Sequence, residues 1–167
     1  HWGGGTPTYL TPAEMEALQR KVLEHFRKDA DADVASETDP RVITQEQMDG
    51  LKALGFNRIS MGVQDFTPEV QEAINRNQTE RETRDHFEYC RKLGFHSINI
   101  DLIYGLPLQT PEAFDRNMDA ILDMKPDRVA VYSYAYVPWI KANQKRIDTS
   151  QLPGPEAKLR LFCIARE

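Results

Sequence analysis

The stretch SINIDLI (97–103) alternates polar and apolar residues, which is typical of a β-strand with two different faces. Ile98, Ile100 and Leu102 would share one face, and Asn99 and Asp101 the other. We expect helices to cover the apolar face, and in a barrel the polar face would be the interior. Because a buried carboxylate needs a partner, Asp101 is either a ligand-binding group or one half of a structural salt bridge with an arginine.

Strand-like runs recur on both sides of this stretch. VASE (34–37), RISMGV (58–63) and RVAVYSYAY (128–136) are rich in β-branched and aromatic residues, and His1-Trp2 is interpreted as the stub of a further strand. Helical patterns separate these runs, so the chain has about five βα units. This alternation predicts an α/β fold of parallel strands, arranged as an open sheet or a barrel, in one domain that spans residues 1–167.

A threonine is expected to cap each early helix. The predicted N-caps are Thr11, Thr44, Thr67, Thr79 and Thr110, each followed by a proline or by a capping-box Glu or Gln. Apolar residues then recur at helical spacing, and we predict that they are buried. They are Met15, Leu18, Val22, Phe26, Met48, Leu51, Leu54, Phe114, Met118, Ile121 and Leu122.

Composition excludes several classes of protein. No apolar run approaches the roughly 20 residues that cross a bilayer, so we expect no membrane insertion. The net charge is −5 and basic residues are interspersed with acidic ones, which argues against nucleic-acid binding. Cys90 and Cys163 lie far apart without clustered histidines, which fits a reducing cytoplasm and offers no metal-ligand set, and we predict that both are small buried residues.

Polar groups follow every predicted strand, where ligands bind in parallel βα folds. In chain order they are Gly3 to Thr6, Glu37 with Asp39, Gln64 with Asp65, Asn99 with Asp101, and Ser133 to Tyr136. Glu37 could equally be a ligand-binding group or cap a turn, and Arg41 could pair with Glu37 or with Asp39. The glycines fit a plain turn, a phosphate cradle or the polar end of a nucleotide-like cofactor, and the five residues before the next helix argue against a phosphate loop.

Several of these segments resemble a known family. HWGGGTPTYL (1–10), ETDPR (37–41), FNRISMGVQDF (56–66), INRNQ (74–78), NIDLIYGLP (99–107) and YSYAYVP (132–138) are similar to the oxygen-independent coproporphyrinogen III oxidases, which are radical S-adenosylmethionine enzymes. Haem-chaperone-like paralogues share the glycine stretch but tend to carry an Asn-Pro version of ETDPR and a Gly-Arg-x-His version of NRNQ. The resemblance therefore favours the oxidases, with a haem-binding carrier as the alternative. A phosphate-binding barrel enzyme such as an aldolase ranks third, because no barrel-end lysine suggests itself as nucleophile.

The resemblance implies a partial TIM-like barrel that holds a 4Fe–4S cluster and two S-adenosylmethionine molecules in its mouth. Gly4 and Glu37, with backbone near Ala135, would contact the molecule nearest the cluster. Gly5, Thr6, Gln64, Arg76 and Asp101 would hold the second. The implied reaction is the oxidative decarboxylation of coproporphyrinogen III to protoporphyrinogen IX in haem biosynthesis, with a small-molecule porphyrinogen as substrate. No general base is expected, because the cofactor carries the chemistry.

Two parts of the family pattern are missing from this sequence. The family's clustered cysteines precede the glycine stretch, and a further domain follows the barrel, so we interpret the chain as a barrel core truncated at both ends. A cluster needs grouped thiolates. We therefore predict that the chain alone holds no cluster and is inactive, and that its exposed sheet edge near Trp2 promotes self-association, whereas the full-length protein would be monomeric.

Overall fold

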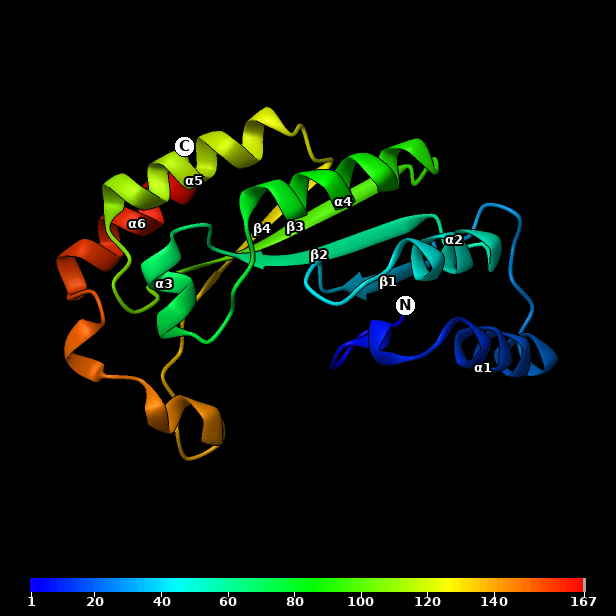
Figure 1. Ribbon diagram of the computed structural model, residues 1–167, viewed down its shortest axis with the longest axis horizontal. Helices are drawn as coiled ribbons and strands as arrows, with labels where there is room; N and C mark the ends of the chain where they lie inside the picture. The colour runs from blue at the N-terminus through cyan, green and yellow to red at the C-terminus, as the bar shows by residue number, and fades with distance from the viewer. Residues whose placement is uncertain (167) are drawn as a thin grey trace.

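The computed structural model describes residues 1–166 as a single parallel sheet with helices packed against it (Figure 1). The strands are β1 (Ala35–Thr38), β2 (Arg58–Gln64), β3 (Ser97–Tyr104) and β4 (Arg128–Ser133). They lie in the order β1-β2-β3-β4, and every neighbouring pair is parallel. Because the order never reverses, the sheet has the topology of an arc of a βα barrel, which confirms the predicted α/β fold of parallel strands.

Helices precede, connect and follow the strands. They are α1 (Pro12–His25), α2 (Gln45–Ala53), α3 (Pro68–Ala73), α4 (Glu80–Lys92), α5 (Pro111–Asp123) and α6 (Pro155–Arg166), with 3-10 helices η1 (Pro7–Tyr9), η2 (Ala142–Arg146) and η3 (Thr149–Gln151). Figure 1 shows α4 and α5 on one side of the sheet, with α1 beside α2 and α6 beside α5. Within residues 1–166, no helix has both the length and the apolar character needed to span a bilayer.

Threonine caps fix where most helices begin. Thr11, Thr44 and Thr79 each form a complete capping box with the residue three positions later, and Thr110 accepts a hydrogen bond from the backbone of Ala113. Thr67 is the exception, because its side chain makes no capping bond to α3. Its hydroxyl instead accepts a hydrogen bond from the Asn117 side chain at 3.3 Å, which ties the start of α3 to α5.

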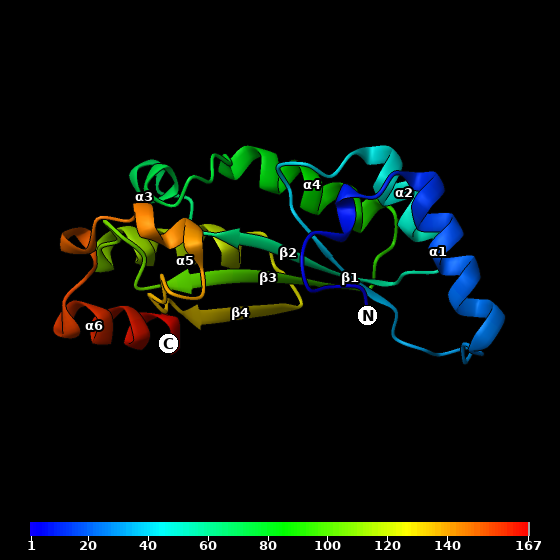
Figure 2. The ribbon, with the colours of Figure 1, turned by 90° about the horizontal axis from the view of Figure 1, so that it is seen from below.

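The two faces of the sheet differ as the sequence predicts. Ile59, Met61, Ile98 and Ile100 are buried beneath the helices, together with the core-facing apolar residues of α2, α4 and α5. The residues between them along each strand, such as Asp101, are only half-buried on the opposite face. Figure 2 views the strands from this polar side. The polar face is therefore the surface on which a ligand can lie.

Two predictions about the sheet are only partly right. The His1-Trp2 stub makes a single parallel bridge between Trp2 and Ser36 and no full strand, so the sheet of the described residues has four strands where the sequence predicted about five. The last run was also predicted too long, since β4 ends at Ser133. The segment from Tyr134 onward leaves the sheet and continues toward η2.

Some residues predicted to be buried are not. Leu18 is 44% exposed, Phe26 69% and Leu122 58%. Phe26 lies just beyond the end of α1 as its C-cap residue, and α1 packs mainly against α2. Cys163 is also exposed, on α6, whereas Cys90 is buried as predicted.

Candidate functional site

A polar cavity of about 160 Å³ lies at the carboxyl ends of β1, β2 and β3. Its lining comes from the glycine segment, the three strand ends and the segment between α3 and α4. The lining residues are Gly5, Thr6, Glu37, Thr38, Asp39, Ser60, Gly62, Gln64, Arg76 and Asp101. The cavity thus brings together most of the site residues that the sequence predicts.

The register of the strands places these side chains next to one another. Glu37 pairs with Ser60 across β1 and β2, and Gly62 pairs with Asp101 across β2 and β3. The β2–β3 register shifts between Gly62 and Gln64, and Gln64 adopts a left-handed conformation with φ 73°. A Cβ on Gly62 would lie 2.9 Å from the Gln64 amide nitrogen, so a larger residue here would displace the end of the Gln64 side chain.

Asp101 is held by hydrogen bonds and has no arginine partner. Its carboxylate accepts from the Ser60 hydroxyl at 2.8 Å and from the Asn99 amide at 2.7 Å. The salt bridge considered as an alternative in the sequence is therefore not the arrangement found among the described residues. Both donors are neutral, so the negative charge of Asp101 stays available to a cationic group in the cavity.

The glycine segment lies against Glu37. The backbone N–H of Gly4 donates to the Glu37 carboxylate at 3.3 Å, and the His1 ring nitrogen lies 3.4 Å from the same carboxylate. A Cβ on Gly3 would come within 2.5 Å of a Glu37 oxygen. Gly4 and Gly5 have φ values of 86° and 149° and would have no atom within 4 Å of an added Cβ, so they present bare backbone to open space.

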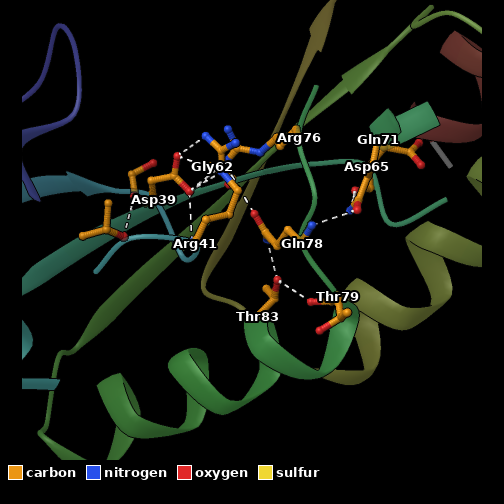
Figure 3. A network of polar contacts seen from close by, with 11 residues as sticks. Asp39, Arg41, Gly62, Asp65, Gln71, Arg76, Gln78, Thr79 and Thr83 are labelled. Atoms are coloured by element: carbon orange, nitrogen blue, oxygen red, sulfur yellow. Dashed lines mark hydrogen bonds and ion pairs between the residues drawn. The ribbon is translucent and has the colours of Figure 1, made fainter. Parts of the chain in front are cut away.

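Arg41 pairs with Asp39 and not with Glu37, and Arg76 joins the same carboxylate (Figure 3). The Arg41 guanidinium lies 2.6 Å from Asp39, and the Arg76 guanidinium lies 3.2 Å from it and also donates to the Gly62 carbonyl. Burial would raise the pKa of Asp39, but hydrogen bonds from Arg41 and the charges of both arginines outweigh it and lower that pKa. Burial lowers the pKa of Arg76, against the charge of Asp39.

Replacing Asp39 with asparagine is expected to lower the free energy of unfolding by about 2 kcal/mol at pH 7, because two arginines lose their shared anion. The folded pKa of Asp39 lies below its unfolded value, so this stabilisation is present above about pH 4 and is lost as the pH falls through the folded pKa. Denaturant unfolding between pH 7 and pH 2 should show that the difference in free energy of unfolding between wild type and variant disappears only in acid. A gap that stays constant would contradict the ion-pair explanation.

A buried network behind the cavity was missed by the sequence interpretation. Gln78 donates from its backbone to the Gln71 side chain at 3.0 Å and from its amide to the Thr83 hydroxyl at 2.5 Å (Figure 3). Asp65, which is fully buried, accepts from Gln109 at 2.7 Å. These contacts fix the segment that carries Arg76. No local sequence pattern predicts these hydrogen bonds, because each one joins residues from two different segments of the chain.

Ala135 lies outside the cavity. It follows the end of β4, and its carbonyl accepts a hydrogen bond from the Gln144 amide at 3.0 Å. Gly4 contacts Glu37 at the rim without lining the cavity. Of the eight predicted residues, the structure thus gathers Gly5, Thr6, Glu37, Gln64, Arg76 and Asp101 in one cavity, with Gly4 beside it and Ala135 apart.

The cysteines do not form a metal site. Burial raises the pKa of the Cys90 thiol to about 12, so it stays protonated, and Cys163 is exposed on α6. Over residues 1–166, no three His, Cys, Asp or Glu side chains are grouped so that they could hold a metal ion. The residues present therefore do not fit an iron–sulfur cluster, which needs grouped thiolates.

Comparison with known proteins places this fold and cavity in a family. A family model described as the radical SAM superfamily matches residues 1–121. Over 97% of its length the chain is 48% identical to "Oxygen-independent coproporphyrinogen III oxidase" from Escherichia coli K12 and 42% identical to the protein of that name from Synechocystis sp.. The chain spans only 35% of each of these curated relatives.

Solved structures agree with the family match. Coproporphyrinogen III oxidase from Escherichia coli, described as a radical SAM enzyme, superposes with a TM-score of 0.95 at 47% identity, covering 99% of this chain and 38% of that one. The archaeal Elp3 of Methanocaldococcus infernus has a TM-score of 0.67 at 18% identity and shares the fold. The resemblance stated from the sequence motifs is confirmed, and so is the partial-barrel core. The family model matches most of the chain, and the chain therefore belongs to the radical SAM superfamily.

Proposed function

We propose that this chain forms the S-adenosylmethionine-binding side of an enzyme that oxidatively decarboxylates coproporphyrinogen III to protoporphyrinogen IX. The observation that carries the proposal is the single cavity in which residues distant in sequence, Glu37, Gln64, Arg76 and Asp101, come together. The names of relatives more than 40% identical over 97% of the chain support the reaction.

The cavity suits the amino-acid end of S-adenosylmethionine. Arg76 brings a positive charge and Asp101 a negative one to the same lining, which complements a ligand that carries a carboxylate and an ammonium group. Gly5 and Thr6 belong also to a second, less polar hollow of about 380 Å³, lined further by Trp2, Leu10 and other residues of the N-terminal segment. A ligand with one zwitterionic and one aromatic end would match the two adjoining hollows.

The proposed roles follow from this arrangement. Gly5, Thr6, Gln64, Arg76 and Asp101 would hold one S-adenosylmethionine, while Gly4, Glu37 and backbone near Ala135 would contact another, nearer to the cluster. In this superfamily S-adenosylmethionine supplies the radical that abstracts a hydrogen from the substrate. The residues of this chain would bind and orient the cofactor with charges and bare backbone, and none of them is required to move a proton.

The complete enzyme should convert coproporphyrinogen III under anaerobic conditions only when S-adenosylmethionine is added, and this assay tests the proposal. The isolated chain should fail, because its two cysteines cannot hold a 4Fe–4S cluster. Iron and sulfide reconstitution of the isolated chain, followed by EPR of the reduced sample, should give no cluster signal. A stoichiometric 4Fe–4S signal would overturn this prediction, and a complete enzyme that binds haem but converts no coproporphyrinogen would favour a carrier.

Two further proposals concern the cellular location of the enzyme and the self-association of the isolated chain. We propose that the enzyme acts in the cytoplasm, since free thiols such as those of Cys90 and Cys163 persist in reducing compartments. We propose that the isolated chain self-associates, because Trp2 covers the outer edge of β1 at one position only. Cell fractionation tests the first statement, and light scattering that reports a monomer at high concentration would contradict the second.

A further inference from the structure

A third hollow, of about 460 Å³, adjoins the polar cavity at Gln64 and Arg76, which line both. Its wall combines aliphatic side chains with cations. Ile74, Ile103 and Leu106 supply part of the aliphatic wall. This composition suits a ligand that has an apolar body and charged substituents, and it differs from the polar lining of the first cavity.

The hollow is positively charged. Arg41, Arg76 and Arg146 line it, and no acidic residue belongs to its lining. Asp39 lies behind it and pairs with both Arg41 and Arg76, so two guanidinium groups share a single carboxylate and a net positive charge remains. The whole chain carries a net charge of −5, so the positive charge of this hollow is a local feature. A local positive charge favours the binding of an anion.

Polar groups next to the hollow are left without partners. Among the described residues, neither the Nε of Arg76 nor the hydroxyl of Tyr134 has a hydrogen-bond partner, although both atoms are buried. Burial raises the pKa of Tyr134, so its hydroxyl stays protonated at neutral pH. An unsatisfied buried donor costs free energy that a ligand oxygen can recover.

Gln144 fixes the wall that carries Arg146. Its side chain accepts from the Val137 backbone at 2.6 Å and donates to the Ala135 carbonyl at 3.0 Å. These two bonds hold η2 against the segment that leaves β4. Arg146 ends η2 and is exposed, so its guanidinium can reach a ligand without breaking a packed contact.

We propose that this hollow is a carboxylate-binding subsite, in which Arg146 and Arg41 hold the carboxylate and the aliphatic wall contacts the apolar body of the same ligand. The assignment rests on the proposed function, under which the propionate groups of the tetrapyrrole have this chemistry. The methionine end of S-adenosylmethionine carries a carboxylate too, so the test uses both ligands.

Arg146→Gln in the complete enzyme is the test variant, and Lys145→Gln is its matched control. Lys145 is the neighbouring exposed cation on η2 and does not line the hollow, so both variants remove one positive charge from the same short helix. The probes are coproporphyrin III, followed by its absorbance, and S-adenosylmethionine, followed by calorimetry. Loss of one charge-assisted hydrogen bond should lower the affinity for the affected ligand about 10-fold. Lys145→Gln should leave both affinities within about twofold of the wild-type values.

The affinities for the two ligands show which carboxylate the subsite binds. Weaker coproporphyrin III binding in Arg146→Gln alone assigns the subsite to a propionate, and weaker S-adenosylmethionine binding alone assigns it to the methionine carboxylate. Equal losses in both variants, or no loss in either, would overturn the subsite. If the wild-type enzyme binds S-adenosylmethionine but neither binds coproporphyrin III nor converts coproporphyrinogen III, the proposed function fails, and the subsite is then decided by the S-adenosylmethionine measurements.

Discussion

Replacing Arg76 with glutamine is expected to lower the affinity for S-adenosylmethionine by about 100-fold and the free energy of unfolding by about 3 kcal/mol. The guanidinium lines the polar cavity while it bonds to Asp39, the Gly62 carbonyl and Gln78. Glutamine is shorter and neutral, so it can neither pair with a ligand carboxylate nor reach all of these acceptors. The affinity loss and the stability loss thus arise from the same side chain.

Arg81→Gln is the matched control for this variant. Arg81 lies on α4 with a side chain that is 90% exposed, and its only described ion pair is a 3.8 Å contact to Asp85. Exposed pairs of this kind are worth about 0.5 kcal/mol. Calorimetry with S-adenosylmethionine and urea unfolding of both variants give the two readouts. If Arg76→Gln retains wild-type affinity while losing stability, Arg76 is structural and the assignment of the cavity is wrong.

The strands and the positions of most site residues could be predicted because they depend on short-range patterns. The alternation in 97–103 assigns Asp101 to the polar face of β3, and parallel strands bring their carboxyl ends to one edge, where Glu37 and Gln64 also lie. Arg76 follows no strand, and only the family resemblance pointed to it. Its pairing with Asp39 joins two separate connections of the chain, and local sequence carries no signal for such a contact.

The residues that were wrongly predicted to be buried show a second limit of prediction from sequence. The apolar spacing of 12–25 correctly identifies a helix but cannot say what covers each side of it. Met15 is fully buried where α1 contacts α2, whereas Leu18 lies beside the hollow near the glycine segment and is 44% exposed. A residue that lines a binding site can look like a core residue in the sequence, since both are apolar and recur with the same period.

Asp101→Asn is expected to weaken S-adenosylmethionine binding about 30-fold while changing the free energy of unfolding by less than about 1 kcal/mol. The asparagine oxygen can still accept from Asn99, and its amide can donate to the Ser60 hydroxyl, which can rotate to accept it. The hydrogen-bond network therefore survives, and the variant removes little besides the negative charge. The loss should fall on the cationic part of the ligand, its ammonium or sulfonium group.

The control for this charge effect is Asp119→Asn, an equal change at an exposed position on α5. Calorimetry with S-adenosylmethionine and with uncharged adenosine separates two explanations. If the charge of Asp101 attracts the cation, adenosine binds wild type and Asp101→Asn equally, and Asp119→Asn resembles wild type for both ligands. An equal loss for both ligands in Asp101→Asn would mean that the carboxylate shapes the cavity and does not act through its charge. The structure favours the charge explanation, because both donors to Asp101 are neutral and Arg76, the cation that lines the same cavity, pairs with Asp39 instead.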